Sequence, residues 1–178
     1  MRIYRQRDAL SPGVSAYIGL GSNLHGPAGQ IERAFVELNV LPRTRLLARS
    51  HLYRSRPLGP QDQPDYINAV AMLTTELAPL KLLQALRKLE EGHGRRRTVE
   101  GHWGARSLDL DILMYGDVRV NTPELTLPHP QMHVRSFVLY PLAELAPTLV
   151  IPGHGQVQVL RNHCHTPAIE SYKEAANE

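Results

Sequence analysis

The stretch Trp103-Gly-Ala-Arg-Ser-Leu-Asp-Leu-Asp-Ile112 says most about the fold. Asp109 and Asp111 alternate in it with leucine and isoleucine, and this pattern predicts a β-strand over residues 107–115. Because side chains of a strand alternate between its faces, both carboxylates would lie on one face and the apolar side chains on the other. Two neighbouring carboxylates repel each other unless a cation lies between them. The stretch therefore predicts a half-buried strand that presents an acidic pair.

The chain before this strand alternates between strand-like and helix-like patterns. The apolar residues predict, in chain order, a strand over 14–20, a helix over 31–41, strands over 46–53 and 66–73, and a helix over 79–92. With the acidic strand added, this is the βαββαβ order of a ferredoxin-like α+β sandwich. We therefore expect an antiparallel sheet with helices on one face, and a second face open to C-terminal elements or a ligand.

The remaining segments are less regular. They are an irregular lead at 1–13, a long loop before the acidic strand, a short arm at 118–120, irregular chain at 122–130, a helix over 137–145 that Pro141 interrupts, and a weakly patterned end from about Val157. The loop before the acidic strand is long enough to be a mobile catalytic segment. No repeat is visible, so we expect a single domain over 1–178 with a divergent tail from about 160 to 178.

The composition limits location and partners. Of the 178 residues 42% are hydrophobic, and no apolar run has the length of a membrane-spanning helix. The lone Cys164 excludes an internal disulfide and the N-terminus lacks the apolar core of a secretory signal, so we expect a cytoplasmic protein with no membrane partner. The net charge of +3 is concentrated in Arg95, Arg96, Arg97 and Arg106, which favours a small-anion site over a nucleic-acid surface.

The acidic pair beside these arginines is the first candidate site. Asp109 and Asp111 could simply be a solvated strand face, since two aspartates at this spacing are weak evidence on their own. Next to arginines they match a magnesium-bound polyphosphate, because magnesium takes one or two carboxylates together with phosphate oxygens and waters. Arg95, Arg97 and Arg106 are either a solvated charge run or groups that neutralise a transferring phosphate.

Other side chains extend this candidate site. Trp103 is either a loop anchor or a lid that excludes water from a ligand. Tyr66 and Asn68 share a strand face, and are either a packed strand start or an aromatic plate with an amide suited to a flat heterocycle. His129 and Arg135 are either surface residues or a phosphate-binding pair.

Four segments in this order resemble the 6-hydroxymethyl-7,8-dihydropterin pyrophosphokinases of folate biosynthesis. They are Tyr17-Ile-Gly-Leu-Gly-Ser-Asn23, the run Pro57-Leu-Gly-Pro-Gln-Asp-Gln-Pro-Asp-Tyr-Ile-Asn-Ala69, the run Trp103-Gly-Ala-Arg-Ser-Leu-Asp-Leu-Asp-Ile-Leu113, and Leu127-Pro-His-Pro130 with Arg135-Ser-Phe137. The resemblance covers the chain from about Ala16 to Pro152. It implies a ferredoxin-like enzyme that transfers the pyrophosphoryl group of ATP to the hydroxymethyl group of the pterin and releases AMP. We expect these two small molecules as its partners, and a monomer.

The resemblance also implies roles for individual residues. Two magnesium ions would be bound by Asp109 and Asp111, with ATP as co-substrate. The pterin would be bound by Ser55, Leu58, Tyr66, Asn68 and Phe137. ATP would be bound by Glu90, Arg97, Trp103, Arg106, Ile112, His129 and Arg135. The catalytic set would be Arg95, Arg97, Arg106, Asp109 and Asp111, and which of the three consecutive arginines contacts which phosphate stays open.

Two other functions are alternatives. Ferredoxin-like sheets also bind RNA, but the chain has only 2 phenylalanines and no basic, aromatic-rich motif of the kind that such domains use. A pterin- or nucleotide-binding protein without activity is the second alternative, and the intact pair of Asp109 and Asp111 argues against it.

Overall fold

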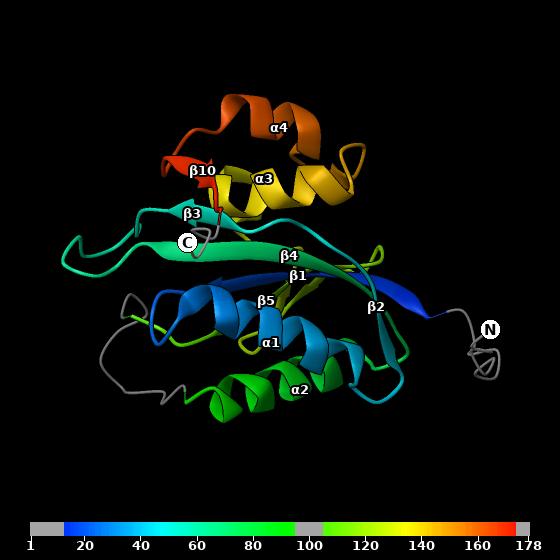
Figure 1. Ribbon diagram of the computed structural model, residues 1–178. Coiled ribbons are helices and arrows are strands. Elements are labelled where there is room, and N and C mark those ends of the chain that lie inside the picture. Colours follow the sequence, from blue (N-terminus) through cyan, green and yellow to red (C-terminus); the bar gives the residue numbers. More distant parts are fainter. Residues whose placement is uncertain (1–12, 95–104, 174–178) are drawn as a thin grey trace, which may run out of the picture.

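The computed structural model describes residues 13–94 and 105–173, and its centre is an antiparallel sheet between two helical layers (Figure 1). Its elements are β1 (Val14–Ser22), α1 (Pro27–Asn39), β2 (Thr44–Arg49), β3 (Tyr53–Ser55), β4 (Tyr66–Thr75), α2 (Pro79–Gly92), β5 (Asp109–Tyr115), β6 (Val120–Asn121), β7 (Thr126–Leu127), η1 (Met132–Val134), α3 (Ser136–Leu145), β8 (Val150–Ile151), β9 (Gly155–Gln156), α4 (Val157–His163) and β10 (Ile169–Ser171). The main sheet has the order β10-β3-β4-β1-β5, with β2 also paired to β4. The predicted combination of helices with an antiparallel sheet is confirmed.

The central strands bring the acidic motif to the middle of the molecule. β1 lies between β4 and β5 and is antiparallel to both. In this register Gly19 lies opposite Asp111, and Gly21 lies opposite Asp109. The two aspartates are therefore held by a neighbouring strand rather than by a loop.

α1 and α2 cover one face of the sheet (Figure 1). A continuous apolar core lies between them and the sheet. Both helices begin at a proline, whose missing N–H costs nothing in the first turn. Most residues of their predicted apolar stripes are at most 2% exposed, namely Ile31, Ala34, Phe35, Leu38, Leu82 and Leu86. The other predicted members, Leu41, Leu83 and Leu89, are partly buried against the same core. Each large side chain buried in this way contributes about 1.5–3 kcal/mol, so this core fixes the position of β5.

A second apolar cluster joins the opposite face to α3. Leu139 and Leu142 of α3 pack in it with Leu113 and Met114 of β5. Asp111, two residues before Leu113, lies on this same side of the strand. The polar site thus begins where the second cluster ends.

The predicted strand over 46–53 is wrong in its continuity, because the chain bends between β2 and β3. At the bend the Ser50 N–H donates to Val70 O at 2.9 Å, and the Val70 N–H donates to Ser50 Oγ at 3.0 Å. A hydroxyl thus replaces a backbone carbonyl in the ladder, and the strand is interrupted there. This bend aims β3 and its final residue Ser55 at the cavity described below.

The chain after β5 is more regular than its sequence predicts. Residues 122–130 were expected to be irregular, but β7 lies among them and pairs with β6. α3 passes through Pro141 without the predicted interruption; Pro141 is itself buried, and tertiary packing of the helix offsets the missing backbone hydrogen bond. The weakly patterned end forms α4 and β10, which are too short for periodicity to reveal.

Candidate active site

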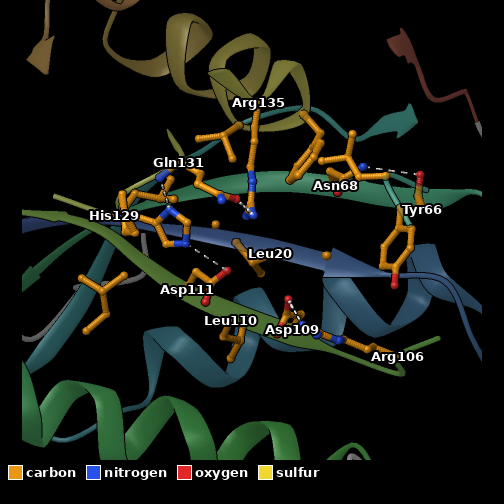
Figure 2. Close-up of a pocket in the computed structure, with 18 of the residues that line it drawn as sticks. Leu20, Tyr66, Asn68, Arg106, Asp109, Leu110, Asp111, His129, Gln131 and Arg135 are labelled. Carbon is orange, nitrogen blue, oxygen red and sulfur yellow. Dashed lines mark hydrogen bonds and ion pairs between the residues drawn. The ribbon is translucent and has the colours of Figure 1, made fainter. Parts of the chain in front are cut away.

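A cavity of about 730 Å³ lies on the α3 side of the sheet (Figure 2). Its floor comes from β1, β4 and β5, and its walls come from the chain after β3, from α2, from the segment around β7 and from the start of α3. Two glycines of β1 keep the floor low: a Cβ at Gly19 would lie 3.3 Å from Leu113 Cδ2, and one at Gly21 would lie 3.5 Å from Asn68 Oδ1. Space is therefore left directly beside the two aspartates.

Asp109 and Asp111 both line this cavity. Leu108, Leu110 and Ile112 pack in the core cluster of α1 and α2, and Leu110 and Ile112 also reach the cavity wall. Desolvation raises the pKa of Asp111 to about 7, and the neighbouring charges of Asp109 and Glu90 add to the rise. Although 47% of the Asp111 side chain is accessible, that access is to the cavity, where protein has displaced much of the bulk water. The site therefore favours extra positive charge.

Glu90 of α2 supports the strand between the two aspartates. Its side chain is 3% exposed, and its Oε1 accepts a hydrogen bond from the Leu110 N–H at 2.8 Å. A buried carboxylate bound in this way fixes the backbone of β5 and adds negative charge beneath the site. Glu90 also forms part of the cavity wall.

Arg106 is held beside the acidic pair by both its backbone and its side chain (Figure 2). Its Nη1 lies 2.6 Å from Asp109 Oδ2. Its N–H donates to Asn23 Oδ1 at 2.7 Å, and its carbonyl accepts from the Asn23 N–H at 3.0 Å. The Asn23 amide donates in turn to Gln63 Oε1 and Pro64 O, each at 3.1 Å. Asn23 thus connects the loop of Arg106 to the loop that precedes β4.

His129 and Arg135 lie on the other side of Asp111 (Figure 2). The Gln131 N–H donates to His129 Nδ1 at 3.2 Å, which places the proton of the neutral ring on Nε2, 4.0 Å from Asp111 Oδ2. Desolvation, with a smaller effect of the Arg135 charge, lowers the pKa of His129 to about 4, so the ring is neutral at pH 7. Arg135 donates a hydrogen bond to Gln131 Oε1, and its guanidinium carbon lies 5.7 Å from the centre of the Phe137 ring.

The opposite end of the cavity, around Asn68, is lined by uncharged side chains apart from the exposed Arg56, and we call it the neutral end. Asn68 is 4% exposed, and its amide donates to Ser55 Oγ at 2.9 Å and to Tyr66 O at 3.5 Å. Both amide hydrogens are engaged, so Asn68 Oδ1 is the atom left to accept a hydrogen bond from a ligand. Tyr66 and Phe137 line the same cavity, and Ile67 lies in the core as the strand alternation predicts.

All the predicted site residues within the described chain line this one cavity. They are Ser55, Leu58, Tyr66, Asn68, Glu90, Arg106, Asp109, Asp111, Ile112, His129, Arg135 and Phe137. Arg95, Arg97 and Trp103 lie outside the described residues, as does most of the loop that we predicted to be mobile.

The sequence reasoning missed several residues that the structure brings to the site. Arg87 lines the cavity, and within the described chain its Nε is buried without a hydrogen-bond partner. Its position three residues before Glu90 on one helix could have revealed it. Gln131 and Asn23 carry no such signal, because their contacts depend on how separate loops meet.

Comparison with known proteins gives concordant matches. A model of the 7,8-dihydro-6-hydroxymethylpterin-pyrophosphokinase family matches residues 17–147. The 2-amino-4-hydroxy-6-hydroxymethyldihydropteridine pyrophosphokinase of Haemophilus influenzae is 51% identical over 140 residues, which are 79% of this chain and 86% of the relative. The protein of the same name from Pseudomonas aeruginosa is 49% identical over 154 residues, 86% of this chain and 94% of the relative.

Solved structures give the same fold at low sequence identity. A crystal structure of Plasmodium falciparum HPPK-DHPS with pteroate matches with a TM-score of 0.68 and 14% identity. The match covers 84% of this chain but 42% of that chain. At this identity the likeness shows the fold alone.

Proposed function

The chain belongs to the 7,8-dihydro-6-hydroxymethylpterin-pyrophosphokinase family, and we propose that this cavity binds magnesium and ATP at the aspartate end and the pterin at the Asn68 end. The enzyme transfers the pyrophosphoryl group of ATP to the hydroxymethyl group of 6-hydroxymethyl-7,8-dihydropterin in folate synthesis. The observation that carries the proposal is the arrangement of Asp109 and Asp111 on the floor of a cavity that also contains Tyr66 and Asn68.

The two aspartates fit magnesium better than they fit a metal enclosed by protein. Among the described residues no group of three or more His, Cys, Asp and Glu side chains could hold a metal ion. Magnesium usually takes only one or two carboxylates and completes its shell with substrate phosphates and waters. The raised pKa of Asp111 supports this assignment, because burial and the charges of Asp109 and Glu90 outweigh the opposing charges of Arg135 and Arg106. Two ions bound there would neutralise and orient the phosphates of ATP.

The cationic and polar groups around the aspartates would bind the rest of the triphosphate. Arg106 and Arg135 flank the acidic pair from two sides, and the His129 Nε2–H points toward it (Figure 2). Positive groups placed around a transferring phosphate stabilise the charge that spreads over its oxygens. By resemblance, Arg95, Arg97 and Trp103 would complete this set, with Glu90 and Ile112 in the wall of the nucleotide site.

The neutral end would bind the pterin. Asn68 Oδ1 would accept a hydrogen bond from an N–H of the ring, because both hydrogens of its amide are already engaged. Tyr66 and Phe137 offer aromatic surfaces for a flat heterocycle, and the chain at Ser55 and Leu58 closes the pocket. The pterin would thus be held as a flat plate with one polar edge fixed.

The reaction would then be a direct displacement. The hydroxymethyl oxygen forms a bond to the β-phosphorus of ATP and loses its proton to water, and the bond from that phosphorus to the oxygen bridging the α-phosphate breaks, which releases AMP. Catalysis would depend on positioning the two substrates in line and on neutralising phosphate charge, with no side chain required as a general base.

Three further assignments follow the same reasoning. The split βαβ order of the main sheet supports a ferredoxin-like arrangement. We propose a monomer, since the predicted site residues that the structure describes already meet within one chain. The single Cys164 supports a reducing compartment such as the cytoplasm. Among the described residues, no helix has both the length and the apolar character needed to cross a membrane.

The direct test is to incubate the protein with ATP, magnesium and 6-hydroxymethyl-7,8-dihydropterin and to separate the nucleotide products. We expect AMP in equal amount to the pterin diphosphate, and none when the pterin or magnesium is omitted. Formation of ADP would contradict pyrophosphoryl transfer, and binding of the pterin without any nucleotide product would indicate a protein that only binds.

A further inference from the structure

The C-terminal segment, defined here as residues 166–172, lies beyond residues 17–147 that match the family model. It contains β10, which lies beside β3 and below α4 in Figure 1. None of its residues lines the cavity. It nevertheless contacts two of the elements that carry proposed pterin-binding residues, β3 with Ser55 and α3 with Phe137.

The first contact is with β3. Ile169 pairs with Ser55, Glu170 with Arg54, and the Tyr172 N–H donates to Leu52 O at 2.9 Å. β3 has 3 residues and pairs otherwise only with β4, so among the described strands β10 is its second neighbour. Without that pairing β3 would be a very short edge strand, which is the least stable position in a sheet.

The second contact is with the start of α3. The Ser136 N–H donates to Thr166 O at 3.3 Å, and the Ser136 hydroxyl donates to Pro167 O at 2.6 Å. Ser136 is fully buried, and its N–H is one of the helix N-terminal donors that have no partner within the helix. The segment thus fixes the first turn of the helix that carries Phe137.

These two contacts converge on the neutral end of the cavity. Ser55, at the end of β3, accepts the hydrogen bond that orients the Asn68 amide. Phe137 follows Ser136 directly and lines the same cavity. One short stretch of chain therefore bridges the two walls between which the pterin would lie.

We propose that the C-terminal segment positions the pterin pocket, by holding Ser55 and Phe137 at a fixed separation. This inference rests on the proposed location of the pterin. The segment would act through other residues, so its loss should weaken pterin binding and leave ATP binding and the chemical step much less affected. If the segment only stabilised the fold, its loss would weaken the binding of both substrates alike.

The first test removes one backbone hydrogen bond between β10 and β3 and leaves the chain at full length. Since Tyr172 and Leu52 form a hydrogen-bonded pair, the alternation of an antiparallel ladder makes Glu170 and Arg54 the next such pair. Glu170→Pro removes the donor, whereas Glu170→Ala keeps it and removes only the exposed side chain that lies 3.6 Å from Arg54. We expect Glu170→Pro to raise the KM for the pterin about tenfold, with less than about a twofold change for Glu170→Ala.

The second test separates positioning from stability. Ser136→Ala removes the hydroxyl that binds Pro167, and Thr44→Ala removes a buried hydroxyl pair with Thr75, 2.7 Å apart, at the far end of β4. Both should lower the Tm by a few degrees, but only Ser136→Ala should raise the KM for the pterin, by about three- to tenfold.

The outcomes are separable. Equal changes in the KM for ATP and for the pterin, or an unchanged KM for the pterin in folded Glu170→Pro and Ser136→Ala proteins, would overturn the positioning role. If Glu170→Pro does not fold, the comparison of the pterin KM between Ser136→Ala and Thr44→Ala decides the question by itself. Failure of the unmodified protein to form AMP would instead refute the proposed function.

Discussion

The two ends of the cavity differ in how far the protein's own groups balance the charges and form the hydrogen bonds of the side chains there. The aspartate end contains Arg106, Asp109, Asp111, His129 and Arg135. There acidic groups face one another, and the pKa of Asp111 rises because of burial and of its acidic neighbours. At the neutral end, Asn68 is already oriented by Ser55 and by the backbone of Tyr66.

This difference indicates a division of labour. An end in which like charges are only partly compensated is completed when a cation and its polyanion bind, so its residues should control the rate. An end that is already hydrogen-bonded is preorganised for a neutral ligand, so its residues should control affinity. Substitutions at the two ends should therefore change different kinetic constants.

The largest expected effect is at Asp111. Asp111→Ala should lower kcat by on the order of 10³-fold, because one carboxylate cannot hold the metal ions that neutralise the phosphates. The Tm should stay the same or rise, since one member of a repelling pair is removed. The measurement is AMP formation at saturating ATP and magnesium beside a melting curve. Turnover within tenfold of the unmodified protein would show that Asp111 is not needed for the metal.

Arg106→Ala should lower kcat by roughly 10²-fold and change the KM for ATP much less, because its charge matters most when negative charge builds up in the transition state. Arg33→Ala is the matched control, since Arg33 forms an exposed ion pair with Glu37 at 2.9 Å on α1. Steady-state kinetics on both variants give the comparison. A larger effect on the KM for ATP than on kcat would assign Arg106 to binding alone.

At the neutral end, Asn68→Ala should raise the KM for the pterin about tenfold with a smaller change in kcat. The substitution removes the acceptor proposed for the ring and leaves Ser55 without its donor. Titrating the pterin at saturating ATP measures the effect. If kcat fell while the KM for the pterin stayed constant, the division between the two ends would be wrong.

The smallest effect concerns protonation of His129. Its pKa is lowered to about 4 in the folded protein, so between about pH 6.5 and pH 4 the unfolded chain binds more protons than the folded one. Stability from neutral His129 is complete above about pH 6.5 and is lost as the pH falls toward 4. Urea unfolding of the unmodified protein and of His129→Gln across this range should show a steeper acid loss in the former. Identical slopes would indicate an ordinary histidine pKa.

The sequence predicts best the features that depend on local alternation. The faces of Asp109 and Asp111, and of Tyr66 and Asn68, follow directly from the strand period, and each pair lies on the cavity side. The apolar stripes of α1 and α2 could be predicted equally well from helical periodicity, because each helix buries one face in a large apolar core.

The features that escaped prediction depend on distant contacts. The pattern predicts one strand over 46–53 in place of β2 and β3, because the bend at Ser50 depends on a side-chain hydrogen bond to another strand. β10 has 3 residues and pairs with a strand more than a hundred positions earlier, so no local sequence pattern predicts it. The role of Asn23 in connecting two loops was hidden in the same way.

The central claim is that Asp109 and Asp111 together bind the metal ions that position ATP. The most direct measurement is a crystal structure with a non-hydrolysable ATP analogue, the pterin and manganese in place of magnesium, with the metal located by anomalous scattering. We predict metal ions bound to oxygens of both aspartates at about 2.1 Å, with phosphate oxygens completing their shells. Metal bound to the phosphates alone, with neither aspartate as a ligand, would contradict the account.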